Sequence, residues 1–123
     1  MKKNILITGA GGFLGKGLVK PFEENGGYTL RLLDVVNFSS QHEVVIGDVC
    51  DIESLDKAME GIDGIIIAHM APRGENNINY KTPEMAFDIN IKGTANIFHC
   101  AVQRGIKNIV VISSESAVNG YER

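Results

Sequence analysis

The 123-residue sequence predicts an α/β fold built on a doubly wound parallel sheet. Short apolar segments alternate with amphipathic segments along the whole chain, which is typical of strands that alternate with helices. A glycine-rich turn directly follows the first apolar segment, and glycine punctuates the later segments as well. With 44% hydrophobic and 22% charged residues, we expect one globular domain over residues 1–123.

Five segments are expected to be strands. They are residues 4–8, Tyr28–Asp34, Glu43–Ile46, 64–68 and 108–112. The segment 64–68 (GIIIA) is entirely apolar, as in strands that are buried on both faces. Because helices separate the strands, we expect right-handed crossovers and a Rossmann-type sheet of strand order 3-2-1-4-5. Ligands bind such a sheet at its carboxyl edge, near the switch between strands 1 and 4.

Three segments are expected to be helices. They are residues Phe13–Asn25, 52–60 and 83–104. Pro21 falls inside the first helix, which it is expected to kink or shorten, and residues 26–27 (GG) close that helix. Asp51 is the expected cap of the second helix, which stops at Gly61, and Gly105 ends the third.

A polar loop, residues 71–82, leaves the carboxyl end of the fourth strand. Binding loops lie at this edge of a parallel sheet, but an ordinary solvated connection fits the same composition. Both interpretations stay open.

The strongest motif is residues 8–15 (TGAGGFLG), which lies between a predicted strand and a predicted helix. Gly9 permits a tight turn, Gly12 lets a pyrophosphate approach the backbone, and Gly15 allows close packing of helix on strand. The first helical residues, Phe13 and Leu14, contribute backbone N–H groups and the positive end of the helix dipole. A glycine-rich turn without a ligand is the alternative.

Asp34 ends the second predicted strand, about twenty residues after the glycine motif, where a carboxylate can accept hydrogen bonds from an adenosine ribose. The same charge repels a 2′-phosphate, so NAD is expected in preference to NADP. Taken alone, Asp34 could also be a simple turn residue at a strand end.

Together with further motifs, these residues resemble the extended short-chain dehydrogenase/reductase superfamily, in its NAD-dependent epimerase/dehydratase family. The matching segments are residues 8–15 (TGAGGFLG), 47–51 (GDVCD), 68–71 (AHMA) and 88–96 (DINIKGTAN). The resemblance implies that Asp48 contacts the adenine amino group, with help from the backbone of Val49. The resemblance also implies that Ala68, His69 and Met70 line the cofactor near its ribose. It implies that Asn90 supports the active-site architecture.

Without the resemblance these residues have simpler interpretations. Asp48 could lead the following helix, His69 could be an ordinary strand-end histidine, and Asn90 could be an exposed polar position.

Residues 113–120 (SSESAVNG) are similar to the family's S-S-x-x-V-Y-G, whose second serine hydrogen-bonds the substrate oxygen. Counting from the strand makes Ser114 the catalytic equivalent, whereas counting back from Gly120 gives Glu115. We favour Ser114, because strand register is harder to shift than a loop. Asn119 stands where the family has a tyrosine.

The family's Tyr-x-x-x-Lys, which transfers a proton and holds the nicotinamide ribose, has no counterpart. Tyr28, Tyr80 and Tyr121 have no lysine four residues later. The chain also ends before a sixth strand and the family's substrate-binding region. We therefore expect the amino-terminal part of a longer enzyme, and whether it is a fragment or a split gene product stays open. On its own, the chain is expected to bind NAD weakly and turn nothing over.

The predicted function is thus the NAD-binding part of an oxidoreductase, epimerase or dehydratase that acts on a sugar or sugar-nucleotide by hydride transfer. A non-catalytic dinucleotide-binding sensor is the alternative, and an NADP-linked reductase is a third hypothesis. The net charge of −3 argues against nucleic acid or an anionic membrane as partner. A homodimer through the helix at 83–104 is compatible with the resemblance.

The two cysteines lack zinc-ligand spacing and the three histidines lack a metal-binding arrangement, so we expect no metal. The first apolar run is too short for a signal peptide or a transmembrane helix. A cytoplasmic protein is expected.

Overall fold

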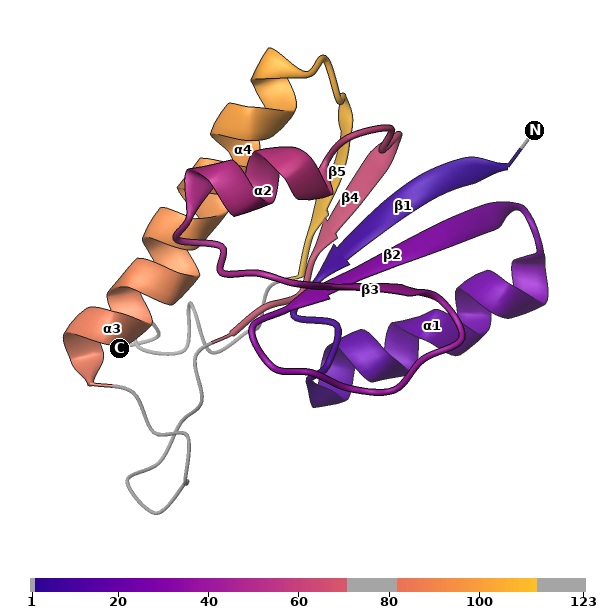
Figure 1. The fold of residues 1–123 in the computed structure, drawn as a ribbon, viewed down its shortest axis with the longest axis horizontal. Helices are drawn as coiled ribbons and strands as arrows, with labels where there is room; N and C mark the ends of the chain where they lie inside the picture. Colours follow the sequence, from indigo (N-terminus) through magenta and orange to yellow (C-terminus); the bar gives the residue numbers. More distant parts are fainter. Residues whose placement is uncertain (1, 71–81, 113–123) are drawn as a thin grey trace, which may run out of the picture.

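The computed structural model describes residues 2–70 and 82–112. Its five strands are β1 (Lys3–Thr8), β2 (Tyr28–Asp34), β3 (Glu43–Ile46), β4 (Gly64–Ile67) and β5 (Asn108–Val111). All neighbouring strands pair in parallel, in the order β3-β2-β1-β4-β5 (Figure 1). The predicted fold class and strand order are confirmed, and the strand bounds differ from the predicted ones by at most one residue.

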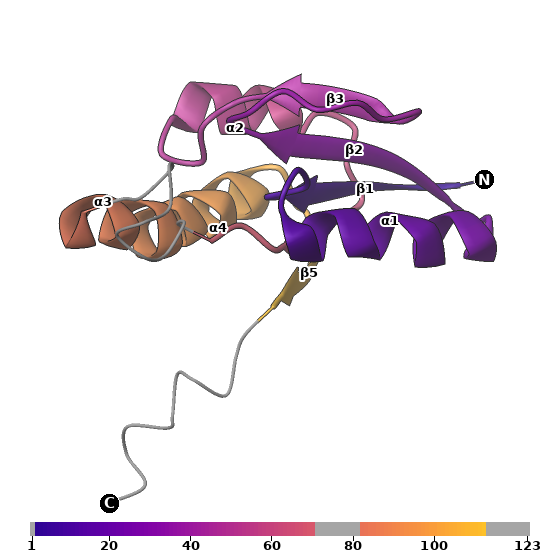
Figure 2. The same cartoon turned by 90° about the horizontal axis from the view of Figure 1, so that it is seen from below.

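Helices cover both faces of the sheet. Helix α1 (Phe13–Asn25) packs on one face, and α2 (Ile52–Ala58) and α4 (Gly93–Gln103) pack on the other (Figures 1 and 2). Successive side chains of β1 point to opposite faces of the sheet, as in any β-strand. Leu6 belongs to the cluster beneath α2 and α4, and Ile7 to the cluster beneath α1; both are fully buried.

Pro21 does not shorten α1, contrary to one of the two expected effects. The helix continues to Asn25 and ends at Gly26, whose φ of 77° places it in the left-handed region. The N–H group of Gly26 bonds to the carbonyl oxygen of Phe22, as in a glycine-capped helix end. Pro21 removes one backbone donor, and this loss does not end the helix.

Helix α2 begins as predicted, because the side chain of Asp51 accepts a hydrogen bond from the backbone N–H of Glu53 at 3.1 Å. It ends at Ala58, two residues before the predicted end at 60. Arg31 of β2 binds the chain at this point, since its Nη1 donates to the carbonyl oxygens of Ala58 and Glu60 at 2.6 and 2.7 Å. A tertiary contact therefore coincides with the early end of this helix.

The single helix expected at 83–104 consists of three consecutive segments. Helix α3 (Pro83–Phe87) leads into a π-helical turn, η1 (Asp88–Lys92), and then into α4. In the π turn the N–H of Gly93 bonds to the carbonyl oxygen of Asp88, five residues earlier. The sequence predicted the extent of the helical region but not this irregular turn.

Candidate nucleotide-binding site

The glycine-rich turn connects β1 to α1 at the carboxyl edge of the sheet. Gly9 has a φ of 68°, and a Cβ at this position would lie 2.6 Å from the backbone nitrogen of His69. Gly15 packs equally closely, because a Cβ there would lie 2.6 Å from the Cα of Ala10. The tight turn and the close helix–strand packing predicted for these two glycines are both present.

The start of α1 is open to an approaching group. Gly12 is the N-cap residue and provides no side-chain cap, and the first turn of α1 contains no acidic residue. A Cβ on Gly12 would meet only the carbonyl oxygen of Gly9, at 3.4 Å, and Phe13 is 99% exposed. The first N–H groups of a helix have no partner within the helix and carry partial positive charge. This end of α1 can therefore bind an anionic group such as a phosphate.

Asp34 links the end of β2 to the glycine-rich turn. Its Oδ2 accepts a hydrogen bond from the backbone N–H of Gly11 at 2.9 Å, and its Oδ1 accepts one from the N–H of Val35 at 2.7 Å. The carboxylate is half-buried, and it retains lone pairs for further donors. The contact with Gly11 was not predicted, although both residues lie in predicted motifs.

Asp48 and Val49 lie in the connection between β3 and α2. The Oδ1 of Asp48 accepts a hydrogen bond from the N–H of Cys50 at 2.9 Å, which fixes the turn before α2. Val49 is buried, and its carbonyl oxygen accepts a hydrogen bond from the Nδ2 of Asn96 at 3.1 Å. Asp48 and Val49 were predicted site residues, whereas Asn96 was not, although it is the last asparagine of the matching segment 88–96.

His69 follows β4 and uses both ring nitrogens within the protein. Its Nε2 lies 2.9 Å from the carbonyl oxygen of Ile89, and its Nδ1 lies 3.0 Å from the hydroxyl of Thr8. Because a carbonyl oxygen only accepts, we assign the ring proton to Nε2, and the hydroxyl of Thr8 then donates to Nδ1. Burial lowers the pKa of His69, which favours the neutral ring, although the bond to Ile89 and the charge of Asp34 oppose this shift.

The other predicted residues lie around this edge. Ala68 is half-buried beside His69, and Met70 is exposed. Asn90 lies in the π turn, where its carbonyl oxygen accepts a hydrogen bond from the hydroxyl of Thr94 at 2.7 Å. Leu14 lies in the first turn of α1 and is partly exposed.

Ser114 and Glu115, the two candidates for the catalytic serine position, lie outside the described residues. The predicted loop at 71–82 is described only at residue 82, where Thr82 caps α3 by accepting a hydrogen bond from the N–H of Met85.

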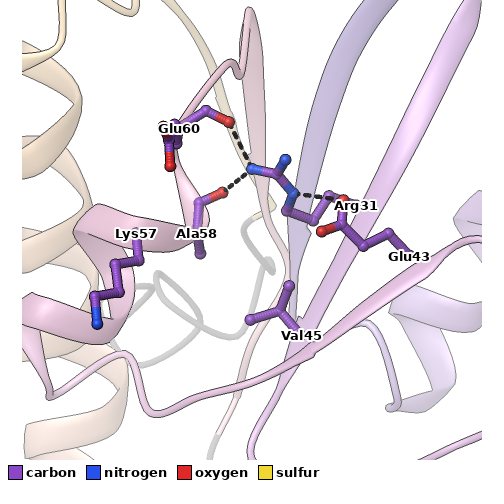
Figure 3. Close-up of a pocket in the computed structure, with 6 residues that line it drawn as sticks. All are labelled: Arg31, Glu43, Val45, Lys57, Ala58 and Glu60. Carbon is purple, nitrogen blue, oxygen red and sulfur yellow. Dashed lines mark hydrogen bonds and ion pairs between the residues drawn. The ribbon is translucent and has the colours of Figure 1, made fainter.

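Of two cavities in the described residues, one lies beside the glycine-rich turn and the other lies away from it. The first has a volume of about 170 Å³ and is lined by Ala10, Lys16, Val19, Leu32, Phe38, Ser39 and Ser40. The other, of about 320 Å³, lies where Arg31 reaches from β2 to the end of α2 (Figure 3). In that cavity the Nε of Arg31 donates to Glu43 at 2.8 Å and its Nη1 to the end of α2, so the guanidinium serves the fold.

Within residues 2–70 and 82–112, no group of three or more histidine, cysteine or acidic side chains could hold a metal ion. In the same ranges, no helix has the length and apolar character needed to cross a bilayer.

The chain matches one family model and several known proteins. The family model described as the NAD dependent epimerase/dehydratase family matches residues 5–122. A relative from Escherichia coli O157:H7, N-acetyl-alpha-D-glucosaminyl-diphospho-ditrans,octacis-undecaprenol 4-epimerase, is 30% identical over 93% of this chain and 33% of its own. The NAD-dependent glucose-6-phosphate dehydrogenase of Haloferax volcanii is 31% identical over 99% of this chain and 47% of its own.

Among solved structures, a mutant of uronate dehydrogenase from Agrobacterium tumefaciens complexed with NAD has a TM-score of 0.75 and 28% identity. The match covers 94% of this chain and 42% of that one. The chain thus spans between a third and a half of the length of these proteins.

Proposed function

The chain belongs to the NAD dependent epimerase/dehydratase family, and from that premise we propose that it forms the NAD-binding part of an enzyme. That enzyme would be an oxidoreductase, epimerase or dehydratase that transfers a hydride to or from a sugar or sugar-nucleotide. The sugar class is supported by the printed activities of the E. coli epimerase and the H. volcanii dehydrogenase.

One observation carries the proposal: the glycine-rich turn and Asp34 are joined through the hydrogen bond from Gly11 to the Asp34 carboxylate. This bond places an acceptor for ribose hydroxyls next to the open start of α1, which offers donors to a pyrophosphate. An adenosine diphosphate group has a pyrophosphate for the start of the helix and ribose hydroxyls for the carboxylate. The residues present therefore fit NAD.

The remaining predicted contacts extend this arrangement. We assign the adenine amino group to Asp48 and the backbone of Val49, and the ribose surroundings to Ala68 and Met70. His69 supports the same edge through its backbone, which lies against Gly9. NAD would supply the hydride-accepting nicotinamide, and Ser114 would hydrogen-bond the substrate oxygen.

A non-catalytic sensor is the alternative function. Residues 1–123 contain no Tyr-x-x-x-Lys, which agrees with this alternative, but both relatives described above are enzymes, so they give it no support. A homodimer, a cytoplasmic location and the absence of other partners stay predictions.

Isothermal titration of the chain with NAD, NADH and NADP tests the proposal. We expect weak binding of NAD and NADH, still weaker binding of NADP, and no turnover by the chain alone. Absence of binding heat from a chain with folded circular dichroism would refute the proposed function.

A variant at the start of α1 makes this test sharper. Gly12→Asp adds a carboxylate where the pyrophosphate should bind, while aspartate at an N-cap is more favourable than glycine by roughly a few tenths of a kcal/mol. We expect an unchanged or higher melting temperature together with loss of NAD binding. Val102→Asp adds the same charge at an exposed position of α4 and should leave binding unchanged.

A further inference from the structure

Three successive carbonyl groups of the π turn each have a side-chain partner. The thiol of Cys50 donates to the carbonyl oxygen of Asp88 at 3.3 Å, and His69 Nε2 donates to that of Ile89 at 2.9 Å. The hydroxyl of Thr94 donates to the carbonyl oxygen of Asn90 at 2.7 Å. Two of these partners come from other parts of the fold, the connection after β3 and the end of β4.

The bond from His69 occupies the acceptor that a regular α-helix would use. In an α-helix the N–H of Gly93 would bond to the carbonyl oxygen of Ile89, four residues earlier. Here that N–H bonds to Asp88 instead, while His69 binds Ile89. The π turn and the histidine contact are therefore two parts of one arrangement.

The helix also lies unusually close to its neighbours at this turn. A Cβ on Gly93 would overlap the side chain of Val49 and lie 3.5 Å from His69 Nε2. Asn96 holds the same connection, because its Nδ2 donates to the carbonyl oxygen of Val49. The close approach brings the backbone of the π turn within reach of the imidazole.

The other side of the imidazole connects to the glycine-rich turn. The hydroxyl of Thr8, the last residue of β1, contacts His69 Nδ1, and it accepts a hydrogen bond from the N–H of Ala68 at 3.3 Å. Gly9, the next residue along the chain, lies against the backbone of His69. One side chain thus joins the start of the glycine-rich turn to the turn that contains Asn90.

We propose that His69 is a positioning residue. With its proton on Nε2, it holds the π turn and thereby sets the position of Asn90 relative to the glycine-rich turn. Within this proposal, only the effect of His69 on cofactor binding rests on the proposed function. The histidine acts through Thr8 and Ile89, and its ring nitrogens have no role toward the cofactor itself.

Nuclear magnetic resonance tests the arrangement directly. The ¹⁵N shifts of His69 in the unmodified chain should show Nε2 protonated and Nδ1 bare, and a proton on Nδ1 would overturn the proposal. Scalar coupling across the hydrogen bond should connect the N–H of Gly93 to the carbonyl of Asp88.

Two substitutions of equal length separate the donor from the bulk of the side chain. His69→Gln keeps an N–H donor near Nε2, and His69→Met removes it. We expect the Gly93 coupling to stay with Asp88 in the glutamine variant and to move to Ile89 in the methionine variant. Coupling that stays with Asp88 in both would contradict the proposal, and the ¹⁵N measurement decides the matter if the methionine variant does not fold.

Titration with NADH provides the functional readout. The glutamine variant should bind within about twofold of the unmodified chain, and the methionine variant about fivefold more weakly, the effect of one net hydrogen bond. Equal affinity of both variants for NADH would mean that the position of Asn90, as set by His69, does not affect cofactor binding. If the unmodified chain binds no NADH, the proposed function fails, whereas the Gly93 coupling still decides whether His69 holds the π turn.

Discussion

Gly15 lies against the carbonyl oxygen of Gly9, so closely that no methyl group fits between them. This contact joins the first turn of α1 to the end of β1 and fixes where the start of the helix lies. Gly17, one half-turn further along the same helix, has open space around its Cα, since a Cβ there would meet nothing within 4 Å. The two glycines therefore offer a matched comparison.

Gly15→Ala should destabilise the protein by about 1–3 kcal/mol, the range for forcing an extra methyl group into a packed site. Gly17→Ala should instead stabilise it by about 0.5–1 kcal/mol, because alanine loses less entropy than glycine in a helix. Unfolding in urea followed by circular dichroism measures both. A neutral result for Gly15→Ala would mean that the helix start can move away from β1.

Asp34→Asn should relax the preference for NAD over NADP. Asparagine keeps an acceptor for the N–H of Gly11 and removes the negative charge that repels a 2′-phosphate. We expect the ratio of the NADP and NAD dissociation constants to fall about tenfold, which corresponds to about 1.4 kcal/mol. Asp34→Ala should relax the preference as well but also destabilise the turn. An unchanged ratio in titrations of both variants would favour an NADP-linked protein.

Asn96→Ala should destabilise the protein by about 1–3 kcal/mol, because it leaves the buried carbonyl oxygen of Val49 without its donor. His99 lies exposed on the same helix, and His99→Ala should change stability by less than about 0.5 kcal/mol. Thermal unfolding of both variants makes the comparison. Equal stability would show that water replaces the asparagine amide.

The sequence predicted the features that depend on neighbouring residues. Strand periodicity, the glycine turn and the Asp51 cap are local patterns, and the structure has each of them where expected. It did not predict the π turn, whose carbonyl groups bind Cys50 and His69 from distant parts of the chain, because such contacts leave no local pattern. The early end of α2 was not predicted either, and it coincides with the contacts that Arg31 makes from β2.

The role of His69 illustrates this difference within the candidate site. The resemblance implies that His69 lies beside the cofactor, and this stays a prediction, while the structure places it directly after β4. A sequence motif records the position of a side chain, however, and not the partners of its ring nitrogens. The contacts of His69 with Thr8 and Ile89 depend on the three-dimensional arrangement of β1, β4 and η1, which the motif does not contain.

Arg31→Met should destabilise the protein by about 1–3 kcal/mol. Methionine preserves much of the apolar stem but leaves the carbonyl oxygens of Ala58 and Glu60 without their donor (Figure 3). Glu43→Gln keeps an acceptor for Arg31 and should cost less than about 1 kcal/mol, because this ion pair is partly exposed. Urea unfolding measures the loss of stability in both variants. An equal loss for Glu43→Gln and Arg31→Met would mean that the ion pair, and not the bonds to the carbonyl groups, is the main stabilising contribution of Arg31.

The stability of the protein should fall as the pH drops below about 6.5, the usual pKa of histidine. Burial lowers the pKa of His69 in the folded protein, so the unfolded chain takes up the proton first. The free energy of unfolding must then decrease with decreasing pH until the folded protein is protonated too, and above neutral pH His69 contributes no slope.

His69→Gln isolates this contribution, because it keeps a donor for Ile89 and cannot take up a proton. Unfolding in urea at about pH 7.5, 6.5 and 5.5 should show a smaller loss of stability in the glutamine variant than in the unmodified chain. The other titrating groups are common to both proteins and cancel in the difference. A difference that stays constant over this range would mean that His69 is protonated as easily in the folded protein as in the unfolded chain, and that burial does not lower its pKa.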